Sequence, residues 1–328
     1  MATYILRRLV ISIPVLLGVS FLVFSLIHIT PGDPAALMLG LEAATDEQLA
    51  MARHQLGLDR PFFVQYADFL SGALRGDFGN SIQQRRPVAD VVLERFPATI
   101  ELALASMLFA LVVAIPLGVI SAIKQYSAVD NASMFVALLG ISMPNFWLGL
   151  LLMLLFAVQL GWLPASGRGG PLLSNLLLSI WYLDPGPLWQ SMERLLLPMI
   201  TLGTGVAALL TRLTRSAMLE VIRQDYIRTA RSKGLADRVV IYRHALRNAM
   251  MPVVTMTGLY FGGLLGGSVI TETIFAWPGV GRMAIQAIYQ RDFPVVQAVV
   301  LMLAVIFVLV NLLVDVVYAV IDPRIRYD

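Results

Sequence analysis

Six apolar runs constrain the fold of this 328-residue chain more than any other feature of its sequence. A helix needs about 20 mostly apolar residues to cross the hydrocarbon core of a bilayer. Apart from His28 at the end of the first run, the six contain no Asp, Glu, Lys, Arg or His. They therefore predict an all-α, polytopic membrane protein with six transmembrane helices. The predicted spans are Leu9–Ile29, Leu102–Ile123, Ala132–Leu160, Leu195–Thr211, Pro252–Thr271 and Phe293–Val314.

The composition supports a membrane protein and gives little sign of catalysis. Hydrophobic residues make up 58% of the chain and charged residues 14%, whereas about 25% of residues are charged in soluble domains. The absence of cysteine excludes a disulfide scaffold and thiolate metal sites. Neither Lys124 nor Lys233 lies in a G-x-x-x-x-G-K-[ST] loop, so the chain lacks this means of binding ATP phosphates. We expect no enzyme active site, no metal and no nucleic-acid partner.

The distribution of Lys and Arg predicts the topology, because these residues are enriched on the cytoplasmic side of a membrane. If the N-terminus is inside, the inside segments hold 14 Lys and Arg and the shorter outside loops hold 4. Residues 30–98 are left out of this comparison because the bias fails for long loops. Both termini are therefore predicted to be cytoplasmic. Four tryptophans then fall on the outer side, as interfacial anchors would: Trp162, Trp181, Trp189 and Trp277.

This topology divides the chain into three regions. Residues 1–29 form an N-terminal tail and the first transmembrane helix, and residues 30–98 form an extracytoplasmic region with a helix expected around Glu47–Leu56. Residues 99–328 form a five-helix core that contains a cytoplasmic segment at 212–251. The apolar run Pro171–Leu183 has 13 residues, which is too short to span, so we expect it to lie at the membrane interface.

Residues 212–251, called the basic segment below, carry nine basic and three acidic residues. Leu219, Ile222, Tyr226 and Ala230 recur at helical spacing. Gly234 then predicts a turn, Asp237 an N-cap, and Pro252 the start of the fifth span. The second helix would carry an apolar stripe of Leu235, Val239, Tyr242, Leu246 and Ala249.

Two interpretations of this helix–glycine–helix unit stay open. Anionic lipid attracts basic residues and would explain the charge alone. A protein partner would also explain the glycine break and the second apolar stripe, and we favour it.

The basic segment also carries the residues of a family resemblance. Asp225–Leu235, followed by His244–Ala249 and Pro252, resembles the cytoplasmic loop of ABC importer permeases. The chain is more closely similar to the B-type permeases of dipeptide, oligopeptide, glutathione and nickel importers. This similarity extends to motifs along nearly the whole chain: Arg7–Leu9, Thr30–Pro34, Leu56–Pro61, Gly76–Gly79, Phe275–Gly279 and Asp322–Tyr327.

The resemblance implies a type I ABC importer permease fold in the cytoplasmic (inner) membrane of a bacterium or archaeon. It implies four partners besides the lipid bilayer: a related second permease, two cytoplasmic ATPase subunits and an extracytoplasmic substrate-binding protein. ATP and Mg would bind to the ATPase subunits, and this chain would hold no cofactor. Peptides are the favoured substrates by resemblance, while glutathione and nickel complexes stay open.

The resemblance also implies that part of the basic segment forms a coupling helix that docks in a cleft of the ATPase. The family motif begins with Glu-Ala-Ala, but Arg228, Thr229 and Ala230 occupy those positions here, so a basic first contact is implied. Ala230 would allow close helix approach, and Gly234 would permit the following turn. The residues assigned to docking are Asp225, Tyr226, Arg228, Thr229, Ala230, Arg231, Lys233, Gly234 and Leu235.

Small and helix-breaking residues inside the spans have two interpretations each. Gly258, Gly262 and Gly266 repeat at a spacing that allows close helix approach. They serve either packing within this chain or the seam with a second permease. In the third span, Ser142, Pro144 and Asn145 either line a polar pathway or mark an ordinary proline kink, which we favour.

The rival function is an ion-coupled secondary carrier that acts without ATPase partners. Such carriers usually place ionisable residues at membrane depth. The six runs contain no acidic residue, which argues strongly against proton coupling. Sodium coupling through backbone carbonyls and hydroxyls stays open as a weaker alternative.

Overall fold

The computed structural model describes residues 2–29, 36, 45–55 and 57–321, and this part of the chain is helical without a named strand. The motifs Thr30–Pro34 and Asp322–Tyr327 lie outside the described residues. The first half contains α1 (Ala2–Ile29), α3 (Asp46–Gln55), α4 (Phe62–Leu74), α5 (Val88–Ile123), α6 (Ala128–Ser142), α7 (Asn145–Leu152) and the π-helix η1 (Met153–Gln159). The second contains α8 (Leu172–Tyr182), α9 (Gly186–Ile222), α10 (Asp225–Ser232), α11 (Asp237–Val239), the π-helix η2 (Val240–Ala245), α12 (Leu246–Gly267), α13 (Val269–Ile274), α14 (Val280–Tyr289) and α15 (Phe293–Ile321).

Five helical segments in the described residues are long and apolar enough to cross a membrane: Leu6–Leu26, Val88–Ile123, Gly186–Ile222, Asp237–Gly266 and Phe293–Val314. The predicted third span is not one straight helix, because α6 and α7–η1 meet at an angle of 104°. Pro144 disfavours helical backbone at the residue before it, and Met143 is extended. The described residues then contain six candidate spans if this bent pair counts as one.

The long helices α5 and α9 form the centre of the bundle. They have 36 and 37 residues, which at 1.5 Å per residue gives about 55 Å, well beyond the apolar thickness of a bilayer. Glycine lets their backbones touch: a Cβ at Gly118 would lie 2.9 Å from the Thr211 carbonyl oxygen, and one at Gly203 would lie 2.7 Å from that of Ser106. The two helices therefore pack as a tight pair along most of their length.

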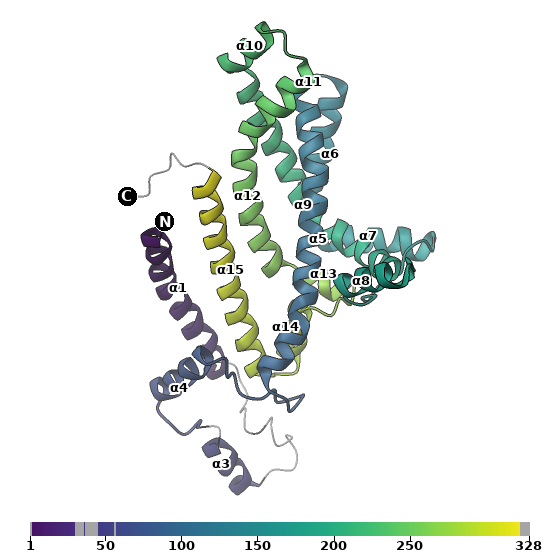
Figure 1. Cartoon of the computed structure of the whole chain (residues 1–328). Coiled ribbons are helices and arrows are strands. Elements are labelled where there is room, and N and C mark those ends of the chain that lie inside the picture. The colour runs from purple at the N-terminus through teal and green to yellow at the C-terminus, as the bar shows by residue number, and fades with distance from the viewer. Residues whose placement is uncertain (1, 30–35, 37–44, 56, 322–328) are drawn as a thin grey trace.

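Figure 1 shows α5, α9, α12 and α15 side by side, with α10 and α11 at one end of the bundle and α14 toward the other. Helices α7 and α8 project to the side. The start of α1 and the end of α15 both lie toward the end that carries α10. This arrangement agrees with the expectation that the termini and the basic segment share one side.

Helix α1 lies at the edge of the bundle, where only 17% of its most apolar stretch is buried, against 56% for α9. It is held by α15 and by α4. Phe24 packs against Phe62 and Phe69 of α4 at ring-centroid distances of 5.2 and 5.4 Å. The hydroxyl groups of Ser20 and Tyr66 are 2.8 Å apart. Aromatic packing therefore fixes α1 to the helices that follow it.

The structure also tests the smaller sequence expectations. Helix α3 confirms the helix expected around Glu47–Leu56, although Leu56 itself lies outside the described residues. Three of the four outer tryptophans are exposed, but Trp277 is fully buried. Its indole Nε1–H donates to the Ala98 carbonyl at 2.8 Å. Trp277 is therefore a core residue, and its prediction as an interfacial anchor was wrong.

Candidate functional site

The basic segment contains the predicted glycine turn, which has α10 before it and α11, η2 and the start of α12 after it. Helix α10 is separated from α9 by an extended residue, Gln224, so the expected single helix from Leu219 to Ala230 is broken. Gly234 has φ +77°, a left-handed conformation that suits glycine. Ala236 is the N-cap of α11, so the prediction of Asp237 as the cap was wrong. The structure also places Pro252 inside α12, where the sequence predicted the start of a span.

One face of α10 is buried in this chain. Ile227 and Ala230 are 0% and 8% exposed and belong to a buried cluster with Val119 of α5 and Met218 of α9. The small side chain of Ala230 therefore allows close approach to the chain's own core. Helix α10 is firmly seated at the ends of α5 and α9.

The opposite face of the basic segment is exposed. All predicted docking residues except Ala230 are exposed. Tyr226 and Tyr242 are 43% and 53% exposed, among basic residues such as Arg228 and Arg231. The predicted second stripe divides: Leu235, Val239 and Tyr242 are exposed, whereas Ala249 is buried. Exposed tyrosine and arginine on a firm support have the composition of a protein-binding surface.

A cavity of about 250 Å³ lies between the α6–α7 break, α9 and α12. Asn145 lines it opposite Gly205 and Gly263. Ser142 and Pro144 are exposed beside the break but do not line the cavity. The structure therefore brings one of the three predicted pathway residues to a cavity within the membrane-spanning part. Its other lining residues are Gly140, Ile141, Met143, Leu202, Val206, Leu209 and Leu264.

The three predicted glycines of α12 do not share one environment. A Cβ at Gly258 would overlap Val314, and one at Gly262 would lie 3.1 Å from Phe307, both on α15. These two glycines therefore pack within the chain. Gly266 is exposed with no atom near its missing Cβ, as is Gly263 at the cavity.

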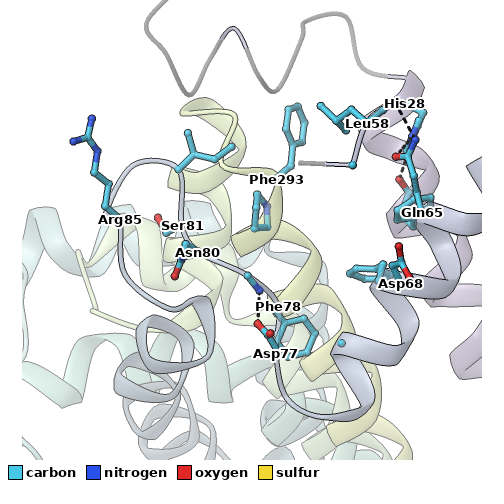
Figure 2. A pocket seen from close by; sticks show the side chains of 17 residues that line it. His28, Leu58, Gln65, Asp68, Asp77, Phe78, Asn80, Ser81, Arg85 and Phe293 are labelled. Carbon is cyan, nitrogen blue, oxygen red and sulfur yellow. Dashed lines mark hydrogen bonds between the residues drawn. The ribbon is translucent and has the colours of Figure 1, made fainter. Parts of the chain in front are cut away.

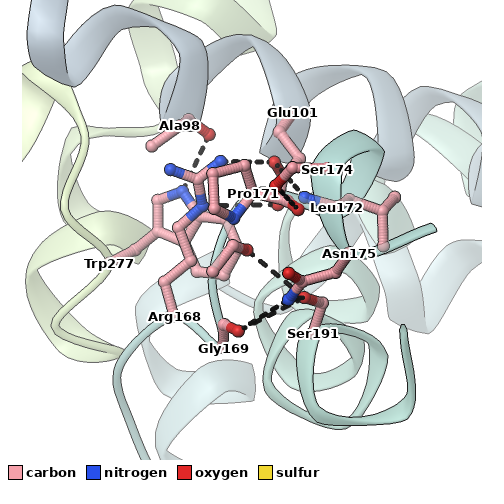
Figure 3. A network of polar contacts seen from close by, with 11 residues as sticks. Ala98, Glu101, Arg168, Gly169, Pro171, Leu172, Ser174, Asn175, Ser191 and Trp277 are labelled. Atoms are coloured by element: carbon pink, nitrogen blue, oxygen red, sulfur yellow. Dashed lines mark hydrogen bonds and ion pairs between the residues drawn. The ribbon is translucent and has the colours of Figure 1, made fainter. Parts of the chain in front are cut away.

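Two carboxylates at the first half of α5 make contacts that the sequence did not reveal. Glu101 forms an ion pair with Arg168, and each side chain is 13% exposed. It also accepts a hydrogen bond from the Leu172 backbone N–H at 3.0 Å, which fixes the start of α8 (Figure 3). The guanidinium of Arg168 lies 5.7 Å from the Trp277 ring centre. The charged partners are 67 positions apart in the sequence, which explains why no local pattern revealed them.

The second missed carboxylate is Glu272, which is fully buried. It accepts hydrogen bonds from the Thr99 and Ser268 hydroxyls at 2.7 and 2.9 Å. The backbone N–H of Arg282 donates to it at 2.9 Å. Glu272 therefore joins α5, α13 and the first turn of α14, where a negative charge is favourable.

A larger cavity, about 750 Å³, lies between the end of α1, α4, residues 77–85 and the start of α15 (Figure 2). Two pairs of its lining groups contact each other: His28 Nε2 lies 3.2 Å from Gln65 Oε1, and the Gly79 N–H donates to Asp77 at 2.9 Å. Asp292, beside α15, accepts from the Ser81 hydroxyl and the Ile82 N–H and so anchors this turn. No cluster of metal-ligating residues occurs in the part of the chain that the structure describes.

Two family models match almost the whole sequence. The model described as "Binding-protein-dependent transport system inner membrane component" matches residues 114–327. The model described as "Binding-prot-dependent transport system membrane comp, N-term" matches residues 1–103. The chain belongs to this permease family.

Curated relatives agree over the full length. The chain is 47% identical to a dipeptide transport system permease protein of Alkalihalophilus pseudofirmus, over 100% of both chains. It is 46% identical to the dipeptide permease of Escherichia coli K12, covering 100% of this chain and 99% of the relative. It is 44% identical to the glutathione permease of the same strain, over 100% of both. The resemblance to importer permeases predicted from the motifs is thus confirmed.

A solved structure supports the fold. The chain is similar to the permease of the MetNI methionine ABC transporter in an inward-facing conformation, with a TM-score of 0.55. The match has 18% identity and covers 71% of this chain and 96% of the other. The predicted all-α ABC importer permease fold is confirmed. This permease family membership also argues against the self-contained secondary carrier.

Proposed function

We propose that this chain is the peptide-transporting permease subunit of an ATP-driven importer. Full-length similarity to dipeptide and glutathione permeases carries the proposal. The exposed surface of the basic segment supports it, because a permease that hydrolyses no ATP needs a surface for an ATPase. Dipeptides or oligopeptides are the favoured substrates, and glutathione and nickel complexes are the alternatives.

In this proposal, α10 and the Gly234 turn dock on one of two ATPase subunits, which hold ATP and Mg. Arg228 and Arg231 offer charge to an acidic cleft, and Tyr226 and Tyr242 offer aromatic contacts. The basic segment and both termini lie in the cytoplasm in this proposal, and the enrichment of Lys and Arg in the basic segment supports this orientation. The chain lies in the inner membrane of a bacterium or archaeon.

The translocation path in this proposal runs along the cavity lined by Asn145. The open faces of Gly263 and Gly266 leave room for a second, related permease, which completes the path. Residues 30–98 lie on the outer side, where a substrate-binding protein delivers the peptide. The five-helix core at 99–328 performs the alternation between the two sides.

Purification of the tagged chain from its native membrane in mild detergent tests the assembly. We expect a Walker-A ATPase and a second multispan permease to co-purify. The purified complex in proteoliposomes is expected to import labelled alanyl-alanine only when ATP is present. Recovery of the chain alone, under conditions that keep a known multisubunit transporter intact, would contradict the ABC assignment. An intact complex that imports nickel or glutathione but no peptide would contradict only the substrate.

A further inference from the structure

The turn between α5 and α6 is closed by one buried carboxylate. The Asp130 side chain is 2% exposed and accepts two hydrogen bonds from Arg215 of α9, from Nε and Nη2, both at 2.7 Å. It also accepts from the Ser121 hydroxyl and, at 2.9 Å, from the backbone N–H of Tyr126. Tyr126 has φ +64°, a strained conformation for this residue type. Asp130 thus gathers α5, the turn, α6 and α9 at one point.

This point lies beside the seat of α10. Arg215 is three residues from Met218, which shares the buried cluster with Ile227 and Ala230. Next to Arg215 in the sequence, Thr214 touches Gly118, where α5 and α9 are in backbone contact. The docking helix and the ion pair therefore rest on the same turns of α5 and α9.

Helix α6 leads from the ion pair to the cavity. It starts at Ala128, two residues before Asp130, and ends at Ser142, directly before the break. Near this far end, a Cβ at Gly140 would lie 3.2 Å from the Ala208 side chain of α9. Between these two points, α6 is a continuous 15-residue helix without proline. A displacement of its first turn is therefore transmitted along the helix to Met143 and Asn145 with little decrease in amplitude.

We propose that the Asp130–Arg215 ion pair makes α6 move together with α9 and α10, so that displacement of α10 by an ATPase reaches the Asn145 cavity. The inference rests on the proposed function and adds two positioning residues to it. A bidentate pair suits this task, because it fixes orientation as well as distance. A buried pair is by itself weak evidence for a stabilising role, since neutral replacements of both partners are often tolerated.

The decisive variant is Asp130→Asn/Arg215→Met in the complete complex. It removes both charges together, so that no buried charge is left unpaired. The one Asn oxygen can accept from the Tyr126 N–H while its NH2 donates to the Ser121 hydroxyl oxygen. In proteoliposomes we expect at least tenfold more ATP hydrolysed per alanyl-alanine imported. Arg215→Lys keeps the positive charge but loses the two parallel hydrogen bonds of the guanidinium. We expect an intermediate ratio of ATP hydrolysed to alanyl-alanine imported. This second variant retains a test if the double variant fails to assemble.

A second readout does not depend on the substrate. The chain contains no cysteine, so Asn145→Cys provides one thiol, and maleimide–polyethylene glycol shifts only this chain's band. We expect ATP with vanadate to change the labelling rate severalfold in the otherwise unaltered complex. The change should vanish in the Asp130→Asn/Arg215→Met background. If the pair had a merely structural role, ATP with vanadate would still change the labelling rate in this background.

Leu195→Ala is the matched control for lost stability. Leu195 is 2% exposed on α9 but lies 20 residues from Arg215. Its truncation should reduce the yield of complex while the ATP per dipeptide and the labelling response stay unchanged. Variants of the pair that assemble and behave as the unaltered complex would overturn the role of the pair alone. If ATP did not change the labelling rate of Asn145→Cys in a complex with the Asp130–Arg215 pair intact, both this role and the proposed function would be overturned.

Discussion

The two ends of the apolar stretch of α5 are both fixed by buried carboxylates, but in different ways. At the α10 end, one buried carboxylate, Asp130, accepts from Arg215 of α9, from Ser121 of α5 and from the backbone of the turn. At the other end, Ala98, Thr99 and Glu101 each make a separate contact, to Trp277, Glu272 and Arg168. The difference indicates distinct tasks. The end at residues 98–101, called the outer end after the proposed topology, is held by several separate contacts. The α10 end depends on a single pair.

The largest effect should come from crowding the outer end. A Cβ at Gly279 would overlap the carboxylate of Glu272, which is held by three donors. Gly279→Val should therefore destabilise the fold by about 3 kcal/mol or more. Thermal unfolding in detergent measures this. Gly18→Ala is the control, because nothing lies within 4 Å of its missing Cβ. Equal melting temperatures for the two variants would refute the outer network as a folding element.

Breaking the outer ion pair should have the next largest effect. Glu101→Gln leaves Arg168 with a nearly buried, unpaired charge, which costs about 3 kcal/mol. Glu101→Gln/Arg168→Met should regain most of this stability, because it leaves no lone charge. The ATP used per dipeptide should stay unchanged in both variants, in contrast to the Asp130–Arg215 pair. A rise in that ratio would show that the two ends share one task.

These contrasts explain how much of the molecule the sequence could reveal. The spans were predictable because the length of an apolar run is a local property of the sequence. The turn at Gly234 was predictable because few other residue types readily adopt positive φ. The pairing of Asp130 with Arg215 joins residues 85 positions apart. Nothing local distinguishes such partners from the other charges at the ends of the spans. Trp277 likewise looks the same in sequence whether it lies in lipid or under Arg168.

Pro144 shows the intermediate case. The residue before a proline is driven toward extended backbone, so a kink in the third span was predictable. The size of the 104° bend was not. It depends on how α7 packs against α9 and α13. For example, a Cβ at Gly149 would lie 3.1 Å from Thr201 and 3.3 Å from Phe275. The sequence thus predicted a break in the helix but not the direction of the bend. The position of Asn145 at the cavity depends on that direction.

A smaller effect is expected at the glycine turn of the α10 end. Gly234 has positive φ and no atom within 4 Å of its missing Cβ, so a substitution acts through the backbone alone. Gly234→Val should cost about 1–2 kcal/mol locally and loosen the ATPase, while the chain still inserts into the membrane. Gly234→Asn should be milder, because Asn tolerates the left-handed region. Co-purification of the ATPase measures both, and full retention with Gly234→Val would exclude the turn from docking.

The smallest effect on stability should come from Arg228, whose side chain is 81% exposed. Arg228→Glu restores the acidic residue of the family motif and should change the free energy of unfolding by less than about 0.5 kcal/mol. It should nevertheless weaken ATPase association and reverse its salt dependence, because a rim charge acts through long-range attraction. Arg60→Glu, at an exposed arginine before α4, controls for net charge. If the Arg228→Glu chain bound the ATPase as tightly as the unaltered chain at low salt, the ATPase would have no acidic surface facing α10. The contrast between the ends would then rest on the Asp130–Arg215 pair alone.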